Sequence, residues 1–326
     1  MEPFEFTRAR NPAEALQQLA APGARLIAGG TGLVDLMKLG VERPARLVDI
    51  NALPLARIEV GAEGARIGAL VRNSDLACHA EVARSYPALA QAILAGASPQ
   101  LRNMATVGGN LLQRTRCPYF RDGSSPCNKR KPGSGCAALG GPHRGHAVLG
   151  TSDSCIATHP SDMCVALLAL DAVVHIMTES GGERAVPLQD FHRLPGNSPE
   201  RETALAPREL VAAVSLPASP RTGRSCYVKV RDRAEFEFAL ASAAVALELA
   251  GGRIQSVRIA LGGVATRPWR AAAAETALSG KAPGIEVFRT AAAAALRDAV
   301  PRRDNAFKVE LAQRCIVRAL AQACAS

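Results

Sequence analysis

The sequence has 326 residues, of which 48% are hydrophobic and 4% aromatic, and its formal net charge is +10. This length allows a sizeable buried core divided into two or three lobes. No apolar run reaches the roughly 18–20 residues that cross a bilayer. The arginines are scattered and aromatic residues are scarce, which argues against a nucleic-acid surface built on base stacking. We expect neither a nucleic-acid partner nor a membrane span.

The N-terminal segment, residues 1–8, carries glutamates where a secretory signal carries basic residues, and no apolar core region follows it. We therefore expect the chain to have no export signal of its own.

Capping and turn residues mark the elements of the first half of the chain. Asn11-Pro12-Ala13-Glu14 predicts a helix start, with Asn as the N-cap, Pro in the first turn and Glu folding back. Asn73-Ser74-Asp75 is expected to cap another helix. The other signals predict helices at 12–20, 33–39 and 87–95, and strands at 25–27, 46–50 and 65–67.

The stretch from 114 to 151 is rich in proline and glycine and has almost no apolar periodicity. A loop of this length inside a compact domain indicates an insertion that something other than ordinary packing holds together. Residues 195–207 are linker-like, and 231–249 include an alanine-rich apolar stretch. Strands are expected at 171–177, 211–216, 225–230 and 253–261, glycine turns at 251–252 and 262–263, and a helix at 305–323.

The first predicted strand of this set, 25–27, runs into the glycine-rich turn Ala28-Gly29-Gly30-Thr31-Gly32, where backbone amides can approach a diphosphate. It lacks the Gly-Lys-Ser/Thr of a P-loop. A Rossmann fingerprint needs a third glycine where Asp35 stands, and a carboxylate there would repel phosphates. Such a turn is also compatible with a plain tight turn. A second glycine turn, Ala105 to Leu111, and Lys229 would complete a dinucleotide site.

Four of the nine cysteines, Cys117, Cys127, Cys136 and Cys155, lie in or just after the insertion. Their spacing lacks the Cys-x-x-Cys pair of a zinc ribbon and leaves three possibilities: a four-iron cluster, zinc, or free thiols. Nearby basic residues would offset the charge of a ligated cluster; they are Arg114, Arg116, Arg121, Lys129, Arg130 and Lys131. The insertion histidines, His143 and His146, are expected to be solvated.

Three segments resemble the flavin-binding signatures of the xanthine dehydrogenase flavin-subunit family: Leu26 to Val34, Ala105 to Leu111, and His159-Pro160-Ser161-Asp162. Lys229 and Leu261-Gly262-Gly263-Val264-Ala265 resemble its C-terminal domain. The resemblance covers essentially the whole chain. It implies an α+β protein with a two-lobed FAD-binding domain of the vanillyl-alcohol-oxidase (PCMH) type over residues 1–220, including an insertion at about 114–156. A smaller α+β domain of the CO dehydrogenase flavoprotein C-terminal type would occupy 221–326.

The cysteine motifs narrow this resemblance. Cys117-Pro118-Tyr119-Phe120, Pro126-Cys127-Asn128, Ser134-Gly135-Cys136 and Cys155-Ile156-Ala157 are similar to the flavin subunit of bacterial periplasmic aldehyde oxidoreductase, which binds FAD and one 4Fe-4S cluster. By resemblance, Cys117, Cys127, Cys136 and Cys155 ligate that cluster. The resemblance also implies that Leu26, Ile27, Ala28, Gly29, Gly30, Thr31, Gly32, Leu33 and Val34 cradle the FAD diphosphate. Thr106, Gly109 and Asn110 would line the cofactor, Asp162 would hold the ribose or a nearby polar group, and Lys229 would approach the flavin.

The implied function is electron transfer in a heterotrimeric, molybdenum-dependent aldehyde oxidoreductase. Electrons would come from a molybdenum-cofactor large subunit and a 2Fe-2S small subunit, and would leave through FAD to an external acceptor. The relatives that this chain resembles are exported as a complex whose signal is on the molybdenum subunit, so the chain is expected in the cytoplasm, or in the periplasm by co-export with a signal-bearing partner. No catalytic residue is expected here, because no Ser/His/Asp or paired-carboxylate constellation stands out. Two alternatives remain: the flavin subunit of a 4-hydroxybenzoyl-CoA reductase, and, from another class, a zinc-stabilised basic binding module.

Overall fold

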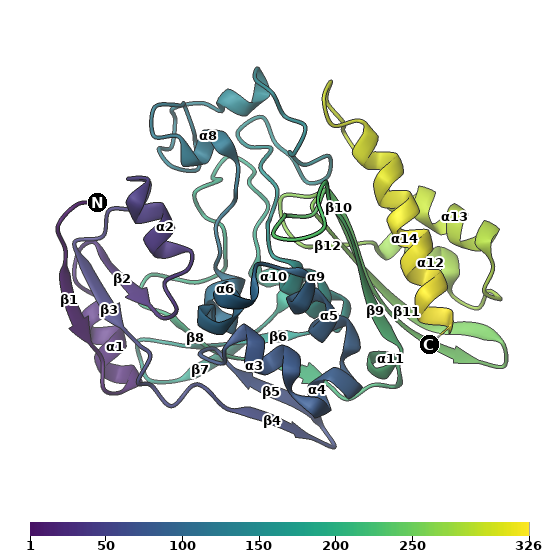
Figure 1. Ribbon diagram of the computed structural model, residues 1–326, viewed down its shortest axis with the longest axis horizontal. Helices are drawn as coiled ribbons and strands as arrows, with labels where there is room; N and C mark the ends of the chain where they lie inside the picture. The colour runs from purple at the N-terminus through teal and green to yellow at the C-terminus, as the bar shows by residue number, and fades with distance from the viewer. Residues whose placement is uncertain (326) are drawn as a thin grey trace.

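The computed structural model describes residues 1–325, whose strands form three sheets (Figure 1). The strands are β1 (Glu5–Arg8), β2 (Ala24–Ile27), β3 (Arg46–Asp49), β4 (Ile58–Gly61), β5 (Gly64–Gly68), β6 (Val173–Met177), β7 (Glu183–Pro187), β8 (Leu210–Pro217), β9 (Ser225–Val230), β10 (Ala241–Ala250), β11 (Arg253–Gly262) and β12 (Trp269–Arg270). The helices of the first 220 residues are α1 (Pro12–Leu19), α2 (Leu33–Lys38), α3 (Asn73–Cys78), α4 (Ala80–Ser85), α5 (Pro87–Ala95), α6 (Pro99–Met104), α7 (Val107–Leu111), α8 (Pro118–Arg121), the short 3-10 helix η1 (Ala137–Leu139), α9 (Asp162–Ala169) and α10 (Leu188–Phe191). The remaining helices are α11 (Pro220–Gly223), α12 (Ala272–Leu278), α13 (Ile285–Ala295) and α14 (Phe307–Ala325).

The first lobe is a parallel sheet with the strand order β1-β3-β2, and α1 packs on it. The predicted helix start is confirmed, because the Asn11 side chain accepts a hydrogen bond from Glu14 N at 2.9 Å. Glu14 folds back as expected, and its carboxylate accepts from Arg10 N at 2.9 Å. The second expected cap is wrong: Arg72 is the N-cap of α3, and Asn73 is already the first residue of the helix.

The second lobe is an antiparallel sheet with the order β4-β5-β8-β6-β7. Its central strand, β8, is the last of the five in sequence, so residues 195–207 connect α10 to β8 inside this lobe. The linker-like segment is therefore not a connection between domains. Its position is held by Arg193 N, which donates to Glu202 O at 3.0 Å, and by ion pairs of the Glu202 carboxylate.

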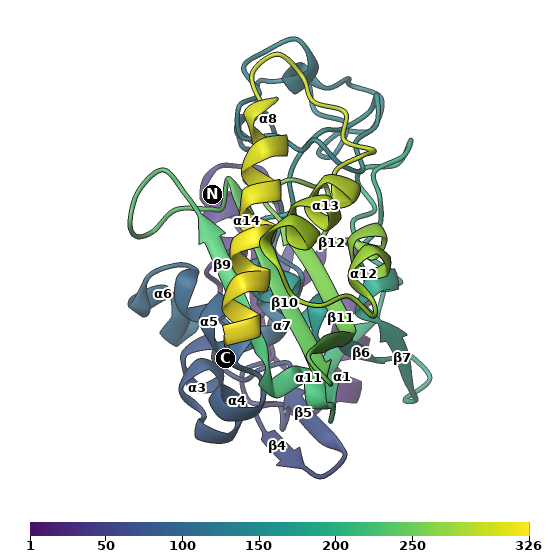
Figure 2. The same ribbon diagram turned by 90° about the vertical axis from the view of Figure 1, so that its right-hand side faces the viewer.

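The third sheet has the order β12-β11-β10-β9, and α12, α13 and α14 cover one face of it (Figure 2). The other face packs on α5 and α9, which also share a core with the five-stranded sheet. Both faces of β10 are buried: Ala244 and Ala246 pack toward α9, whereas Ala243 and Val245 pack toward α14. The alanine-rich stretch is therefore a strand pressed between two helical layers. The small side chains allow both layers to approach closely.

The overall fold class is confirmed, and the boundary between residues 220 and 221 stays a prediction. Among residues 1–325, none of the helices combines the length and the apolar character that a membrane crossing requires.

An ion-pair cluster ties the two parts of the chain together. Asp171, between α9 and β6, accepts from Arg221 and Arg258 at 3.1 Å and from Arg270 at 2.8 Å. Burial raises the pKa of the Asp171 carboxyl, but the arginines outweigh burial and hold its pKa below the usual 3.8. This carboxylate therefore stabilises the fold above about pH 4, and the contribution disappears as the pH falls through the lowered pKa.

We expect Asp171→Asn to reduce the free energy of unfolding by about 1–2 kcal/mol at pH 7, because a third of the side chain is exposed and solvent screens the pairs. Denaturant titrations of wild type and variant should converge as the pH falls below the lowered pKa of Asp171. The exposed Asp298→Asn is the matched control and should change stability by less than about 0.5 kcal/mol. A loss for D171N that is independent of pH would contradict the ionic explanation.

Candidate functional site

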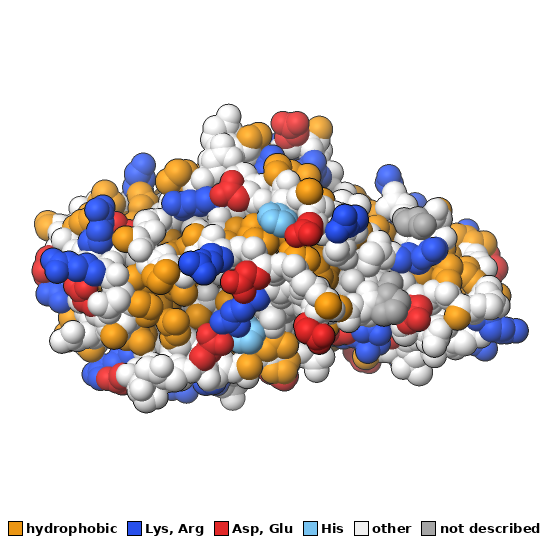
Figure 3. Space-filling model, turned by 90° about the horizontal axis from the view of Figure 1, so that it is seen from below, with side chains coloured by type: hydrophobic (Ala, Val, Ile, Leu, Met, Phe, Trp, Pro, Cys, Tyr) orange, Lys and Arg blue, Asp and Glu red, His pale blue; other side chains and the backbone are white. Residues whose placement is uncertain are grey.

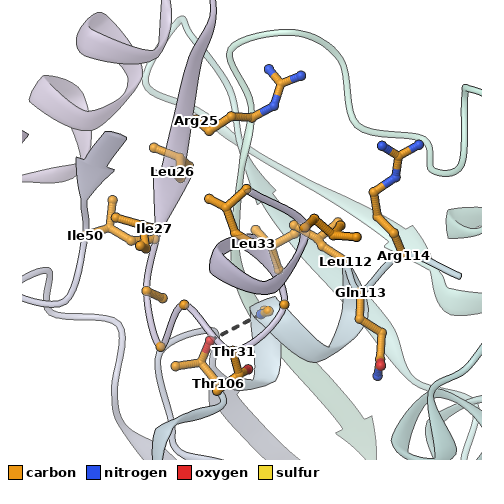
Figure 4. A pocket seen from close by; sticks show the side chains of 18 of the residues that line it. Arg25, Leu26, Ile27, Thr31, Leu33, Ile50, Thr106, Leu112, Gln113 and Arg114 are labelled. Atoms are coloured by element: carbon orange, nitrogen blue, oxygen red, sulfur yellow. Dashed lines mark hydrogen bonds between the residues drawn. The ribbon is translucent and has the colours of Figure 1, made fainter. Parts of the chain in front are cut away.

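The two predicted glycine turns lie against each other. A Cβ added at Gly29 would lie 1.9 Å from the carbonyl oxygen of Met104, so the backbones are in contact there. Gly30 has a φ of +72°, which favours glycine. In the second turn, Thr106 is the N-cap of α7, and its hydroxyl accepts from Gly109 N at 3.2 Å, the dashed line in Figure 4. Residues of both turns line one space.

That space is a cavity of about 310 Å³ (Figure 4). Leu26 and Ile27 lie on one side of it with Ile50, and Leu33 and Leu112 lie on the other. The predicted residues that line it are Leu26, Ile27, Ala28, Gly29, Gly30, Thr31, Gly32, Leu33, Thr106 and Gly109. Val34 does not line it; its side chain lies beneath the turn, 3.3 Å from where a Gly30 Cβ would be.

A second cavity of about 630 Å³ adjoins the first and shares Thr31, Gly32 and Gly109 with it. Asn110, Asp162 and Lys229, which the sequence analysis selected from separate segments, line this second cavity. The two cavities together make one elongated cleft that extends from the parallel sheet to β9. The structure therefore brings together all the predicted cofactor residues except Val34.

Two arginines stand where the cavities meet. Arg116 and Arg121 line both, and each donates to the Asp35 carboxylate at 2.8 Å. The hydrogen bonds from Arg121 help hold the pKa of Asp35 below its usual value, so this carboxylate stays charged and paired. The expected repulsion of phosphates by Asp35 is thus offset, because Asp35, Arg116 and Arg121 together have a net charge of +1. The sequence analysis missed this pairing because Arg116 and Arg121 lie 81 and 86 residues from Asp35 in the chain.

Lys229 and Asp162 form a buried ion pair at 2.8 Å, with side-chain exposures of 4% and 9%. The other oxygen of Asp162 accepts from Tyr227 Oη. Burial and the adjacent Asp162 raise the pKa of Tyr227 well above its usual value, so the phenol keeps its proton and donates. The resemblance implied that Asp162 holds either the ribose or a nearby polar group, and here it contacts two polar groups, Lys229 and Tyr227. The pair fixes the ammonium of Lys229 at the wall of the second cavity.

All four insertion cysteines line one small cavity between α8 and η1. Cys127 and Cys136 face each other across a hairpin, in which Asn128 N donates to Gly135 O at 2.7 Å. Cys117 is the N-cap of α8, and Cys155 ends a tight turn that begins at Ser152. The insertion contains α8 and η1 but no strand among the described residues.

Polar groups surround the Cys117 sulfur. Burial raises the pKa of this thiol to about 12, and backbone N–H groups of Phe120 and Tyr119 oppose that shift by pointing at the sulfur. His146 Nε2 lies 3.2 Å from it. The expected solvation of the insertion histidines is wrong, because His143 is 5% and His146 4% exposed. Both are buried by the turn before α14, which folds over the insertion.

The basic cluster of the insertion is paired internally. Arg114 donates to Glu42 and Glu202, and Lys129 Nζ lies 3.1 Å from Glu202. Arg130 donates to the backbone carbonyls of Tyr119 and Phe120 at 2.9 and 2.7 Å. On the face shown in Figure 3, basic and acidic side chains are likewise interspersed. These cations hold the insertion in place and do not form the open basic surface that a nucleic-acid-binding module needs.

The spacing of the four thiols bears on whether zinc or a four-iron cluster fits the cysteine cavity. In residues 1–325, the group of metal-binding side chains whose ligand atoms all lie within 4.8 Å of one another is His159, Cys164 and His192, in the core beside α9. The four insertion cysteines are not such a group. Around one tetrahedral zinc, sulfurs would be only about 3.8 Å apart, since Zn–S bonds are roughly 2.3 Å. The wider arrangement favours a larger occupant.

Comparisons with known proteins cover both parts of the chain. Residues 2–219 match the family described as the FAD binding domain in molybdopterin dehydrogenase, and residues 226–323 match the CO dehydrogenase flavoprotein C-terminal domain. The chain is 54% identical over 325 residues to the aldehyde oxidoreductase FAD-binding subunit PaoB of Escherichia coli (strain K12), covering 99% of both chains. It is 29% identical to the carbon monoxide dehydrogenase medium chain of Hydrogenophaga pseudoflava, over 97% of this chain and 96% of that one.

Solved structures agree with this. Carbon monoxide dehydrogenase from Hydrogenophaga pseudoflava lacking the Mo-pyranopterin moiety matches with a TM-score of 0.78 and 28% identity, covering 100% of this chain and 99% of that one. Quinoline 2-oxidoreductase from Pseudomonas putida 86 matches with a TM-score of 0.76 and 26% identity, covering 99% and 97%.

Proposed function

Because this chain belongs to the FAD-binding subunits of the molybdenum hydroxylase family and is an oxidoreductase subunit, we propose that it carries electrons in an aldehyde oxidoreductase complex. The observation that supports the aldehyde assignment is the 54% identity, over 99% of both chains, to a subunit of that name. Substrate oxidation would occur at a molybdenum centre on a large partner subunit. A small 2Fe-2S partner would connect that centre to this chain, which would release electrons to an external acceptor.

The residues of the cleft fit FAD. Turn glycines give a diphosphate access to backbone amides, and Gly32 has open space where a Cβ would be. Arg116 Nε is buried without a hydrogen-bond partner among the described residues, so it has a donor to offer. We propose that the turn from Leu26 to Leu33 holds the diphosphate, with Thr106, Gly109 and Asn110 beside it. Lys229 would lie next to the flavin. FAD, when bound, supplies the exchange of electrons between the partner subunits and the acceptor.

The insertion fits a 4Fe-4S cluster ligated by Cys117, Cys127, Cys136 and Cys155. Four thiols line one cavity, their spacing exceeds that of a zinc site, and backbone N–H groups point at Cys117. Free, reactive thiols are disfavoured, since burial raises the pKa of Cys117 to about 12 and keeps an unligated thiol protonated. Burial raises the pKa of Cys155, and the positive charge of Lys129 opposes that shift, so a cation lies near the site of the negative cluster.

The other assignments of the sequence analysis stay predictions. They are the heterotrimeric composition, the external acceptor, and the compartment, which is the cytoplasm or the periplasm by co-export with a signal-bearing partner. A zinc-stabilised binding module gives way to the flavin subunit, because the family match spans residues 2–219 and the basic cluster is paired.

The test is an absorption spectrum with flavin and metal quantitation on anaerobically purified protein. We expect flavin bands, one FAD and about four irons per chain. Flavin with no iron would leave the FAD assignment standing and remove the cluster. Zinc in place of iron would point to a structural metal in the insertion.

A further inference from the structure

The side chain of His146 contacts Cys117, which lines the cysteine cavity. It is 4% exposed, and its Nε2 lies 3.2 Å from the Cys117 sulfur. The ring also lies beside Tyr119, with centroids 6.1 Å apart. A nitrogen at this distance from sulfur is within hydrogen-bonding range, and its tautomer decides which atom donates.

The tautomer follows from the surroundings of the ring. A neutral imidazole carries its single proton on Nδ1 or on Nε2. Nδ1 is buried and has no hydrogen-bond partner among the described residues. A proton on Nδ1 would therefore be unpaired, whereas a proton on Nε2 points at sulfur. An iron-bound thiolate accepts such a proton well, because it carries negative charge.

We propose that His146 tunes the 4Fe-4S cluster by donating a hydrogen bond from Nε2 to the sulfur of Cys117. This rests on the proposed function, because it requires the cluster. Hydrogen bonds to cluster sulfurs stabilise the reduced, more negative state and raise the reduction potential. His146 is a positioning and tuning residue here, since it acts through Cys117.

The C-terminal part of the chain fixes the position of His146. Its carbonyl oxygen accepts from Lys308 Nζ at 3.1 Å and from Asn305 Nδ2 at 3.3 Å. Lys308 is fully buried, and its ammonium also donates to Gly145 O at 2.9 Å and Gly263 O at 2.7 Å. These bonds join the start of α14 to the insertion, next to α8 (Figures 1 and 2). Hydrogen bonds from the C-terminal domain therefore hold the backbone of His146 in place, and with it the ring beside Cys117.

The test compares wild type with His146→Phe, which keeps a ring of similar size and removes the N–H group. Redox titration of the anaerobic protein, followed by EPR of the reduced cluster, gives the midpoint potential. We expect the reduction equilibrium to shift about tenfold toward the oxidised state, which is about 59 mV for one electron. His146→Gln should recover part of the shift, because its amide can donate to the same sulfur.

The matched control is His143→Phe. His143 is equally buried, but its Nδ1 contacts Gly141 O at 2.7 Å, so this variant should leave the potential unchanged. Equal potentials for wild type and H146F at equal iron content would overturn the proposal. If H146F loses its iron, the test uses wild-type protein that contains isotope-labelled histidine. Pulsed EPR of its reduced cluster should detect a weak coupling to a histidine nitrogen. The absence of this coupling would overturn the proposal. A wild type without iron would remove the proposed cluster itself, which is a different result.

Discussion

Cys127→Ala is expected to lose most of the iron of the chain, from about four atoms to fewer than one per chain. Cys127 is 8% exposed and lies in the hairpin opposite Cys136, so alanine there removes a ligand from a buried position. The insertion contains no strand among the described residues, and without the cluster it should become sensitive to proteolysis. Iron quantitation, the charge-transfer absorption and limited digestion measure these effects.

Cys315→Ala is the matched control for that variant. Cys315 is 2% exposed and lies in α14, where its sulfur contacts Val228 O and not the cysteine cavity. It should keep both iron and FAD. FAD should also stay bound in C127A, because the turn glycines and Lys229 belong to other elements. Full iron content in C127A, or iron loss in C315A, would show that these four cysteines are not the ligands.

Gly29→Ala is expected to destabilise the chain by roughly 3 kcal/mol and to abolish retention of FAD on purification. The added Cβ would lie 1.9 Å from Met104 O, a backbone atom that moves only if the second glycine turn moves with it. Displacing the two turns from each other opens the cleft where we propose the diphosphate binds. Denaturant unfolding of the apoprotein and FAD titration measure the two effects separately.

Gly32→Ala tests the same turn with the opposite expectation for stability. Gly32 has no atom within 4 Å of an added Cβ and has a φ of −99°, so the apoprotein should keep its stability within about 0.5 kcal/mol. The new methyl group would instead occupy space that FAD needs, and we expect the affinity to fall about tenfold to a hundredfold. Normal FAD affinity in G32A would place the cofactor away from this turn.

Local signals in the sequence predicted much of the framework. The Asn11 cap, the strand before Gly29 and the turn at Gly251-Gly252 were correct because each depends on residues adjacent in the chain. Both glycines of that turn have positive φ, at 55° and 73°. Resemblance of the short motifs identified the family, which the comparisons confirm. It also selected cofactor residues that the structure brings to one cleft.

Other features could not be read from neighbouring residues. Alanine has the highest helix propensity, yet residues 241–250 form β10, because pairing with β9 and β11 and burial on both faces outweigh local preference. In α3, Arg72 and not Asn73 has the extended backbone of an N-cap, and Asn73 N donates to Ala105 O in the second glycine turn. The segment 195–207 joins elements of one lobe because β8 inserts between β5 and β6.

The sequence by itself determined the glycine turns, the Asn11 cap, the family and the four clustered cysteines, since these depend on residue types at fixed short spacings. Only the tertiary structure decided the electrostatics. Asp35 is paired with arginines 81 and 86 residues away, and the carbonyl of His146 accepts from Lys308, which lies 162 residues further along the chain. Burial and charge depend on every group packed around an atom, and those groups are brought together only when the sheets and helices have been assembled.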